Sequence, residues 1–200
     1  MEKDGSAVVR DRIALTLVKK YLQPKASILE IGSGNGLFIE SLASLGFSLT
    51  ATDLKNFLSP AAREVAKQFQ KIDIDTPWPF HDVSFDSVTA WNVIEHAENP
   101  SHVARESARV LKSGGLLFLS LPNIYNLKNR LYFLRTGDMY RYKGRNSHIT
   151  IITKMVFGRI FKNFDIVETS FYANEPPLLG KIFPKSELFS KTVLYVLRKR

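Results

Sequence analysis

Apolar residues follow two alternating patterns along the first 122 positions of the chain. Short, nearly continuous apolar runs predict buried strands at residues 27–31, 47–52, 71–73, 85–91 and 116–121. Apolar residues spaced by three or four positions predict helices at residues 8–22, 38–45, 61–69 and 100–111. Strands that alternate with helices pair in parallel and carry helices on both faces of their sheet. This part of the chain therefore predicts a doubly wound α/β fold.

The pattern changes after Pro122, where tyrosine, arginine, asparagine and glycine become frequent. We expect helices at 127–134 and 152–161 and strands at 164–172 and 192–198, with the Pro- and Gly-containing residues 175–184 between the strands. A hairpin of these strands would add an antiparallel edge to the sheet. We therefore predict a single domain over residues 1–200, with a seven-stranded, mostly parallel, Rossmann-like sheet and an antiparallel last strand. Residues 123–150 would cover the substrate.

Positive charge is concentrated in the last part of the chain. Residues 1–123 contain 13 basic and 14 acidic side chains, whereas residues 124–200 contain 15 and 5. Such a field attracts phosphorylated substrates, nucleic acid, acidic lipid headgroups or an acidic protein, although a basic solvated surface is an equally ordinary interpretation. The chain has no cysteine, which excludes disulfides, thiolate metal sites and a cysteine nucleophile. It shows neither a signal peptide nor a bilayer-spanning apolar run, so we expect a cytoplasmic protein.

A glycine-rich loop follows the first predicted strand. Residues 30–36 read Glu-Ile-Gly-Ser-Gly-Asn-Gly, with an acid two positions before the first glycine. Glycines let the backbone turn sharply and approach a ligand, and open α/β sheets bind ligands at the carboxyl ends of their strands. A dinucleotide fingerprint would need a third glycine at the position of Leu37. The loop therefore predicts a ligand site that is not of the NAD-binding kind.

Asp53 ends the second predicted strand, 21 residues after Gly32. A carboxylate at this place in an α/β sheet accepts hydrogen bonds from both hydroxyls of a ribose. The alternative is an ordinary solvated aspartate in a loop. Because the glycine loop precedes it, the pair favours a nucleoside ligand.

These residues resemble the class I S-adenosylmethionine (SAM)-dependent methyltransferases, in order and spacing, over residues 28–122. Residues 92–96, Asn-Val-Ile-Glu-His, resemble the segment after the fourth strand in ubiquinone-biosynthesis-type O-methyltransferases. The resemblance implies SAM as cofactor, with S-adenosylhomocysteine as its product. It places the glycine loop around the amino-acid part, Asp53 at the ribose, and Asp73 at the adenine. The cofactor-binding residues that it implies are Glu30, Gly32, Ser33, Gly34, Asn35, Gly36, Asp53, Leu54, Asp73, Ile74, Trp91 and Asn92.

Methyl transfer from a sulfonium is an in-line displacement, in which the protein mainly orients the reactants. An acceptor hydroxyl also needs a base, and the candidates are His148, in the substrate-covering segment, and His96, after the fourth strand. Either histidine could instead be structural, and we expect Glu95 to order its loop. No carboxylates cluster near the fourth strand, so we predict no metal site. The lack of an Asn-Pro-Pro-Tyr-type segment disfavours methylation of amino groups on nucleic-acid bases.

The methyl acceptor has no clear sequence signature. Tyrosines interleaved with basic residues in 123–150 suit an anionic or partly apolar small molecule, methylated at oxygen. The late apolar residues could form another wall of its site or dock a protein partner: Leu178, Leu179, Ile182 and Phe183. Two alternatives stay open. Residues 121–150 contain segments that resemble the MetW-type methionine-biosynthesis proteins, which implies an accessory protein with a SAM-binding fold. The second alternative is an RNA methyltransferase, because the basic tail would attract the phosphates of RNA.

Overall fold

The computed structural model describes residues 5–142, 147–172 and 185–200, with side chains from residue 12 onwards. Its strands form one seven-stranded sheet with the order β3-β2-β1-β4-β5-β7-β6. Five strands pair in parallel: β1 (Ser27–Ile31), β2 (Ser48–Asp53), β3 (Gln68–Lys71), β4 (Phe85–Trp91) and β5 (Leu111–Pro122). The last strand, β7 (Thr192–Lys199), is antiparallel to both β5 and β6 (Phe164–Tyr172). The predicted fold class is therefore confirmed, with β7 inserted and β6 at the edge.

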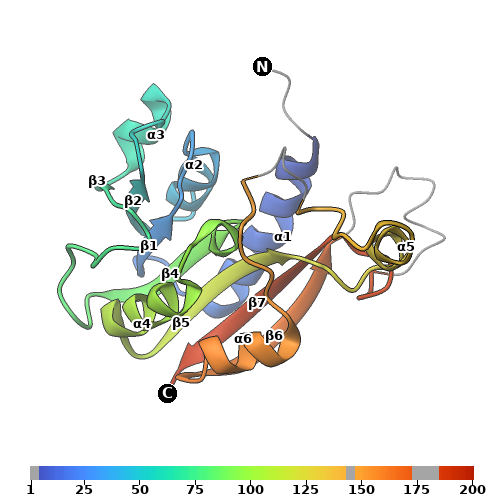
Figure 1. Ribbon diagram of the computed structural model, residues 1–200. Coiled ribbons are helices and arrows are strands. Elements are labelled where there is room, and N and C mark those ends of the chain that lie inside the picture. Colours follow the sequence, from blue (N-terminus) through green and yellow to red (C-terminus); the bar gives the residue numbers. More distant parts are fainter. Residues whose placement is uncertain (1–4, 143–146, 173–184) are drawn as a thin grey trace.

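Helices cover both faces of the sheet (Figure 1). On one face lie α1 (Gly5–Tyr21), α2 (Leu37–Ala43) and α3 (Pro60–Val65), and on the other lie α4 (Pro100–Val110) and α6 (Lys154–Ile160). The sheet divides the core into two clusters, and the consecutive residues Leu117 and Phe118 belong to different ones. Because successive side chains of a strand point to opposite faces, this explains why β5 reads as a continuous apolar run.

Local polar residues set the beginnings of the helices. The side chain of Asn99 accepts a hydrogen bond from the His102 amide, and Pro100 follows as the first helical residue of α4, as predicted. Ser59 caps α3 in the same way, through the Ala62 amide. The helix predicted at 152–161 begins at Lys154, because Thr153 caps it through the Val156 amide.

The prediction of a helix over 61–69 and a strand over 71–73 is wrong at their junction. Helix α3 ends at Val65, and residues 68–71 already pair with β2, in a register that places Gln68 opposite Thr50. The amide of Lys67 donates to the carbonyl of Leu49 at 2.9 Å and starts this pairing. Residues 68–71 form a short, polar edge strand because they pair with β2, although the spacing of apolar residues there is helical.

Two segments lie at the carboxyl ends of the central strands. The 3-10 helix η1 (Ile94–His96) follows β4, and α5 (Leu127–Thr136) follows β5 and stands beside the sheet, seen end-on in Figure 1. The predicted loop 175–184 and the apolar residues named within it lie outside the described residues, as do positions 143–146. Among the described helices, none has the length and apolar character needed to cross a membrane.

Candidate functional site

The glycine loop and Asp53 meet at the carboxyl edge of the sheet. Strand β1 pairs with β2 in parallel, so the loop after β1 lies beside the end of β2. Oδ2 of Asp53 accepts a hydrogen bond from the amide of Gly34 at 2.9 Å, and Oδ1 accepts one from the amide of Leu54 at 2.7 Å. The half-buried carboxylate is therefore oriented at the rim of the loop, where the sequence predicts a ribose partner.

Two glycines of the loop serve different purposes. Both have left-handed backbone conformations, with φ of 53° at Gly34 and 83° at Gly36. A Cβ on Gly36 would lie only 2.3 Å from Cβ of Ala62, so this glycine lets α2 pack against α3. A Cβ on Gly34 would meet no atom within 4 Å. Gly34 therefore borders open space beside Asp53, which fits a ligand-binding loop.

The other predicted residues of the loop are packed differently. Glu30 and Ser33 are buried, and the amide of Ser33 donates to the carbonyl of Thr52 at 2.8 Å, which ties the loop to β2. Asn35 and Leu54 are exposed. The carbonyl of Asn35 accepts a hydrogen bond from the Ser59 amide at 3.0 Å. Leu54 thus offers an apolar side chain at the outer rim of the site.

Asp73 and Ile74 lie in a turn after β3. Oδ1 of Asp73 accepts a hydrogen bond from the amide of Asp75 at 3.0 Å. Asp75 in turn accepts hydrogen bonds from the amides of Glu98 and Asn99, at 2.9 and 2.8 Å, which joins this turn to the start of α4. Ile74 packs against the core beneath the turn. No role was predicted for Asp75, although aspartate in a turn-rich Asp-Thr-Pro segment commonly accepts hydrogen bonds from backbone amides.

Strand β4 ends in a sharp turn held by β5. Asn92 has a left-handed φ of 55°, its amide donates to Oγ of Ser120 at 2.9 Å, and its Oδ1 accepts from the same hydroxyl at 2.7 Å. Trp91 points into the core instead, where its ring meets that of Phe38 edge-on at 5.6 Å. The predicted contact of Trp91 with the cofactor stays a prediction.

Two histidines, one glutamate and the loop 147–150 form a cluster after β4. The amides of Ile149 and Thr150 donate to the backbone carbonyl of Glu95, at 2.9 and 3.1 Å. This brings His148 to His96, with ring centroids 4.8 Å apart, and places Nε2 of His148 3.9 Å from Oε1 of the fully buried Glu95. The two histidines predicted as candidate bases, His96 and His148, therefore lie side by side, next to Glu95, which was expected to order its loop.

This cluster adjoins the glycine loop. A Cβ on Gly32 would lie 2.6 Å from Cγ2 of Val93, which directly precedes η1. The glycine loop, the Asp53 carboxylate and the histidine cluster therefore line one edge of the sheet.

A family described as "Methyltransferase domain" matches residues 29–119. The protein named "Ubiquinone biosynthesis O-methyltransferase" of Xanthomonas oryzae pv. oryzae is 38% identical over 104 residues, which cover 49% of this chain and 44% of that protein. Its counterpart in Xanthomonas axonopodis pv. citri is 36% identical over 118 residues, covering 56% and 49%. The chain thus matches less than half the length of these relatives.

Solved structures agree in fold. A SAM-dependent methyltransferase of Methanosarcina mazei superimposes with a TM-score of 0.65 at 21% identity, over 92% of this chain and 96% of that one. The [4+2]-cyclase SpnF gives 0.69 at 16% identity, over 94% and 80%. Residues 29–119 thus match a methyltransferase domain, and the chain has the Rossmann-like fold of the SAM-dependent methyltransferases. The reaction named for SpnF shows that this fold alone does not fix the chemistry.

Electrostatics favour a neutral His148. Burial, together with the nearby charges of His96 and Arg141, lowers the pKa of His148 below its ordinary 6.5. Burial and the charge of Glu95 also raise the pKa of Tyr142, whose ring lies 5.4 Å from that of His148. A neutral imidazole is the form that can accept a proton.

The protonated nitrogen of His96 follows from its hydrogen bond. Nδ1 of His96 lies 2.8 Å from the backbone carbonyl oxygen of Ser147. Because a carbonyl oxygen only accepts, Nδ1 carries the proton and the lone pair of the neutral ring is on Nε2. His96 therefore presents a basic nitrogen whose orientation is fixed by the loop.

Glu95, His96 and His148 each offer one metal-ligating atom, and these atoms lie within 4.8 Å of one another. Spacing of this kind is compatible with a metal ion. The sequence predicted no metal site because no carboxylates cluster near the fourth strand, and the approach of His148 to Glu95 leaves no sequence pattern. The absence of a metal accordingly stays a prediction.

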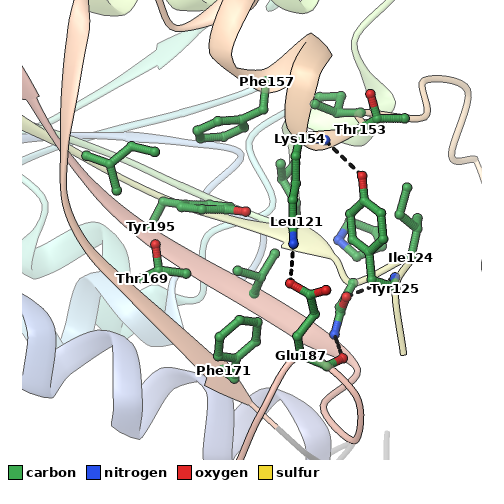
Figure 2. Close-up of a pocket in the computed structure, with 15 residues that line it drawn as sticks. Leu121, Ile124, Tyr125, Thr153, Lys154, Phe157, Thr169, Phe171, Glu187 and Tyr195 are labelled. Carbon is green, nitrogen blue, oxygen red and sulfur yellow. Dashed lines mark hydrogen bonds and ion pairs between the residues drawn. The ribbon is translucent and has the colours of Figure 1, made fainter. Parts of the chain in front are cut away.

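A cavity of about 330 Å³ lies between α6 and the β6–β7 pair (Figure 2). Its walls are largely apolar and aromatic, and Tyr195 stacks on Phe157 with ring centroids 4.3 Å apart. Nζ of Lys154 pairs with Oε2 of Glu187 at 2.5 Å, and the Tyr125 hydroxyl accepts from the Lys154 amide at 2.9 Å. Burial and the charges of Glu187 and Tyr125 raise the pKa of Tyr195 to about 12. Apart from Tyr125, these polar residues carried no sequence signal.

Proposed function

We propose that this chain transfers a methyl group from SAM to a hydroxyl of a small-molecule acceptor. The observation that carries the proposal is the adjacency of two parts: a glycine loop hydrogen-bonded to Asp53, and a cluster of two histidines beside a buried glutamate. The first suits a nucleoside cofactor. The second suits removal of a proton from an acceptor.

The residues of the cofactor site have separable tasks in this proposal. Asp53 accepts hydrogen bonds from the ribose hydroxyls, while the backbone around Gly34 lies against the amino-acid part. Asp73 and Ile74 face the adenine. When bound, SAM supplies an electrophilic methyl group bonded to a positively charged sulfur.

His96 is the base that we favour, because its Nε2 carries the lone pair of the neutral ring. It accepts the acceptor's hydroxyl proton while the oxygen forms a bond to the methyl carbon and the carbon–sulfur bond breaks. The electron pair of that bond stays on sulfur, which becomes a neutral thioether. His148 and Glu95 lie beside His96 and help to orient it and to bear the proton's charge.

The acceptor's apolar part would occupy the cavity of Figure 2. Residues 147–150 contact η1, and Ile152 and Thr153, a few positions later, line the cavity. Tyr195, Thr169 and the Lys154–Glu187 pair offer polar partners among aromatic walls. A partly apolar acceptor with a hydroxyl fits this environment, and residues 123–150 would cover it.

Ligand-dependent thermal unfolding tests the cofactor. SAM or S-adenosylhomocysteine at about 100 times its dissociation constant should stabilise the native protein by roughly 2.7 kcal/mol, whereas NAD should not. Asp53→Ala should lose this stabilisation but stay folded, and Asp138→Ala, a change in the turn after α5, should keep it. If neither adenosyl ligand stabilises the folded wild-type protein, the proposal fails.

The two alternatives predict different results. An accessory protein would bind SAM without turning over any acceptor, and would copurify with a protein partner in stoichiometric amounts. An RNA methyltransferase would retain RNA at physiological salt, because non-specific electrostatic binding weakens steeply as salt rises.

A further inference from the structure

Helix α5 exposes leucines where a surface helix normally exposes polar residues. Leu127, Leu131 and Leu134 are 42%, 58% and 80% exposed. Their spacing of four and three positions places them on one side of the helix. A helix that packs on a protein core usually turns such a stripe inwards, so this apolar side has no partner within the described part of the chain.

The inner side of α5 is polar and firmly held. Asn129 is only 3% exposed, its Nδ2 donates to the carbonyl of Ile124 at 2.5 Å, and its Oδ1 accepts from the amide of Tyr140 at 2.7 Å. The side chain of Asn126 caps the helix by accepting a hydrogen bond from the amide of Asn129. The leucines therefore face outwards because buried hydrogen bonds fix the rotation of the helix, and α5 cannot simply roll over.

Basic side chains flank the leucine stripe. At 100° per residue, Arg130 lies on one side of the stripe, and Lys128 and Arg135 lie on the other. Helix α5 contains no acidic residue. Beside it, a groove of about 340 Å³ is lined by Leu127, Leu131, Leu188 and Phe189 and carries Lys128 and Lys191. The apolar surface thus continues beyond the helix and is bordered by basic side chains, of which Arg130 also lies 4.0 Å from Glu187.

We propose that α5 docks this protein onto an anionic lipid bilayer. The 10-residue helix, about 15 Å long, would lie in the plane of the interface with its leucines in the boundary between headgroups and acyl chains. The basic side chains would contact lipid phosphates, in keeping with the excess of positive charge in residues 124–200. Charge complementarity favours this occupant, because fluid acyl chains adapt to the leucines while lipid phosphates meet the flanking basic side chains.

Vesicle cosedimentation tests the proposal with the whole protein. The wild type should bind vesicles of phosphatidylcholine containing about 30 mol% phosphatidylglycerol in about 0.15 M salt, and bind pure phosphatidylcholine about tenfold more weakly. L131S/L134S should reduce the partition coefficient about tenfold or more. K128Q/R135Q should reduce it mainly at low salt, since screening already weakens the charge contribution at high salt.

The control variants change the same kinds of side chain elsewhere. V65S/M155S removes two exposed apolar side chains from α3 and α6, and R63Q removes a basic one from α3. Both should bind anionic vesicles like the wild type. Thermal unfolding of every variant shows whether it is folded, which is expected because the changed side chains are exposed.

A second readout reports the depth of α5 directly. In a Leu134→Trp variant, the new indole should be quenched by brominated acyl chains in anionic vesicles, unlike the buried Trp78 and Trp91. The proposal is overturned if the wild type stays in the supernatant, or if L131S/L134S binds as well as V65S/M155S. An acidic protein that binds α5 when anionic vesicles do not would show that the surface has a different partner.

Discussion

Nε2 of His148 lies 3.9 Å from Oε1 of Glu95, although His148 belongs to the loop 147–150 and Glu95 to the 3-10 helix η1. Glu95 is fully buried, and its backbone carbonyl binds the two amides that follow His148. The same residue therefore positions the loop through its main chain and faces the imidazole with its side chain. This double contact makes the loop and the histidine pair one unit.

The protonation of His148 should affect folding stability in weakly acidic solution. Its folded-state pKa is lowered, by burial and by His96 and Arg141. As pH falls below 6.5, the unfolded chain binds a proton at this residue before the folded chain does, so stability decreases from 6.5 down towards the folded pKa. His148→Gln should show a shallower decrease over this range. A histidine NMR titration that places His148 at or above 6.5 would contradict this.

His96→Gln should separate chemistry from cofactor binding. The variant removes the basic Nε2, so we expect kcat to fall by a factor of about 10² to 10⁴ with any acceptor that the wild type methylates. The stabilisation by SAM should be unchanged, because Asp53 and the glycine loop remain. A variant that keeps wild-type kcat across the pH range would assign His96 a structural role only.

Gly34→Ala and Gly36→Ala should fail for different reasons. Alanine at position 36 must displace α3, because its Cβ would lie 2.3 Å from that of Ala62, and we expect a loss of about 3 kcal/mol in unfolding free energy. Alanine at 34 meets no neighbour and should cost only about 1 kcal/mol for its left-handed backbone. Calorimetry should find that Gly34→Ala nevertheless binds SAM more weakly. Equal stability losses would rule out this division of roles.

Arg109 should be a major stabilising residue outside the site. Its guanidinium pairs with Glu106 at 2.7 Å and donates to the carbonyls of Trp78 and Phe80, at 2.9 and 2.6 Å. Arg109→Met would leave Glu106 buried without its cation, and we expect a loss of about 2–3 kcal/mol, because the arginine is partly exposed. Urea titration measures this loss. A change below about 0.5 kcal/mol would refute it.

The Glu106–Arg109 pair also has a pH dependence of its own. Hydrogen bonding by Arg109 is the main cause that lowers the pKa of Glu106 below its ordinary 4.5. The pair's contribution is therefore complete above 4.5 and is lost as pH falls through the lower folded pKa. Glu106→Gln should be less stable than the wild type at neutral pH and approach it in acid. A stability difference that stays constant with pH would exclude this linkage.

Strands bounded by turn residues could be predicted from the sequence. The predicted bounds of β1 and β4 agree with the structure because their apolar runs end at Gly32 and Asn92. Strand β3 could not be predicted, since Gln-Phe-Gln-Lys is polar and its conformation depends on pairing with β2. The fold class could be predicted because it depends on the order of the strands and helices, which an error at one boundary does not change.

The candidate site was predictable only where neighbouring strands define it. The meeting of Asp53 with the glycine loop follows from the parallel pairing of β1 and β2. The approach of His148 to Glu95 depends on amides of a loop without regular structure, which leave no pattern in the sequence. The same holds for Lys154 and Glu187, which meet from distant segments.

The position of β7 has a consequence for synthesis of the protein. This strand lies between β5 and β6 and hydrogen-bonds to both, yet it is synthesised after both of them. Until it emerges from the ribosome, β5 presents an open apolar edge and β6 has no partner in the sheet. Nascent chains should therefore expose an aggregation-prone edge until β7 has been made, and a chaperone would be most useful during that interval.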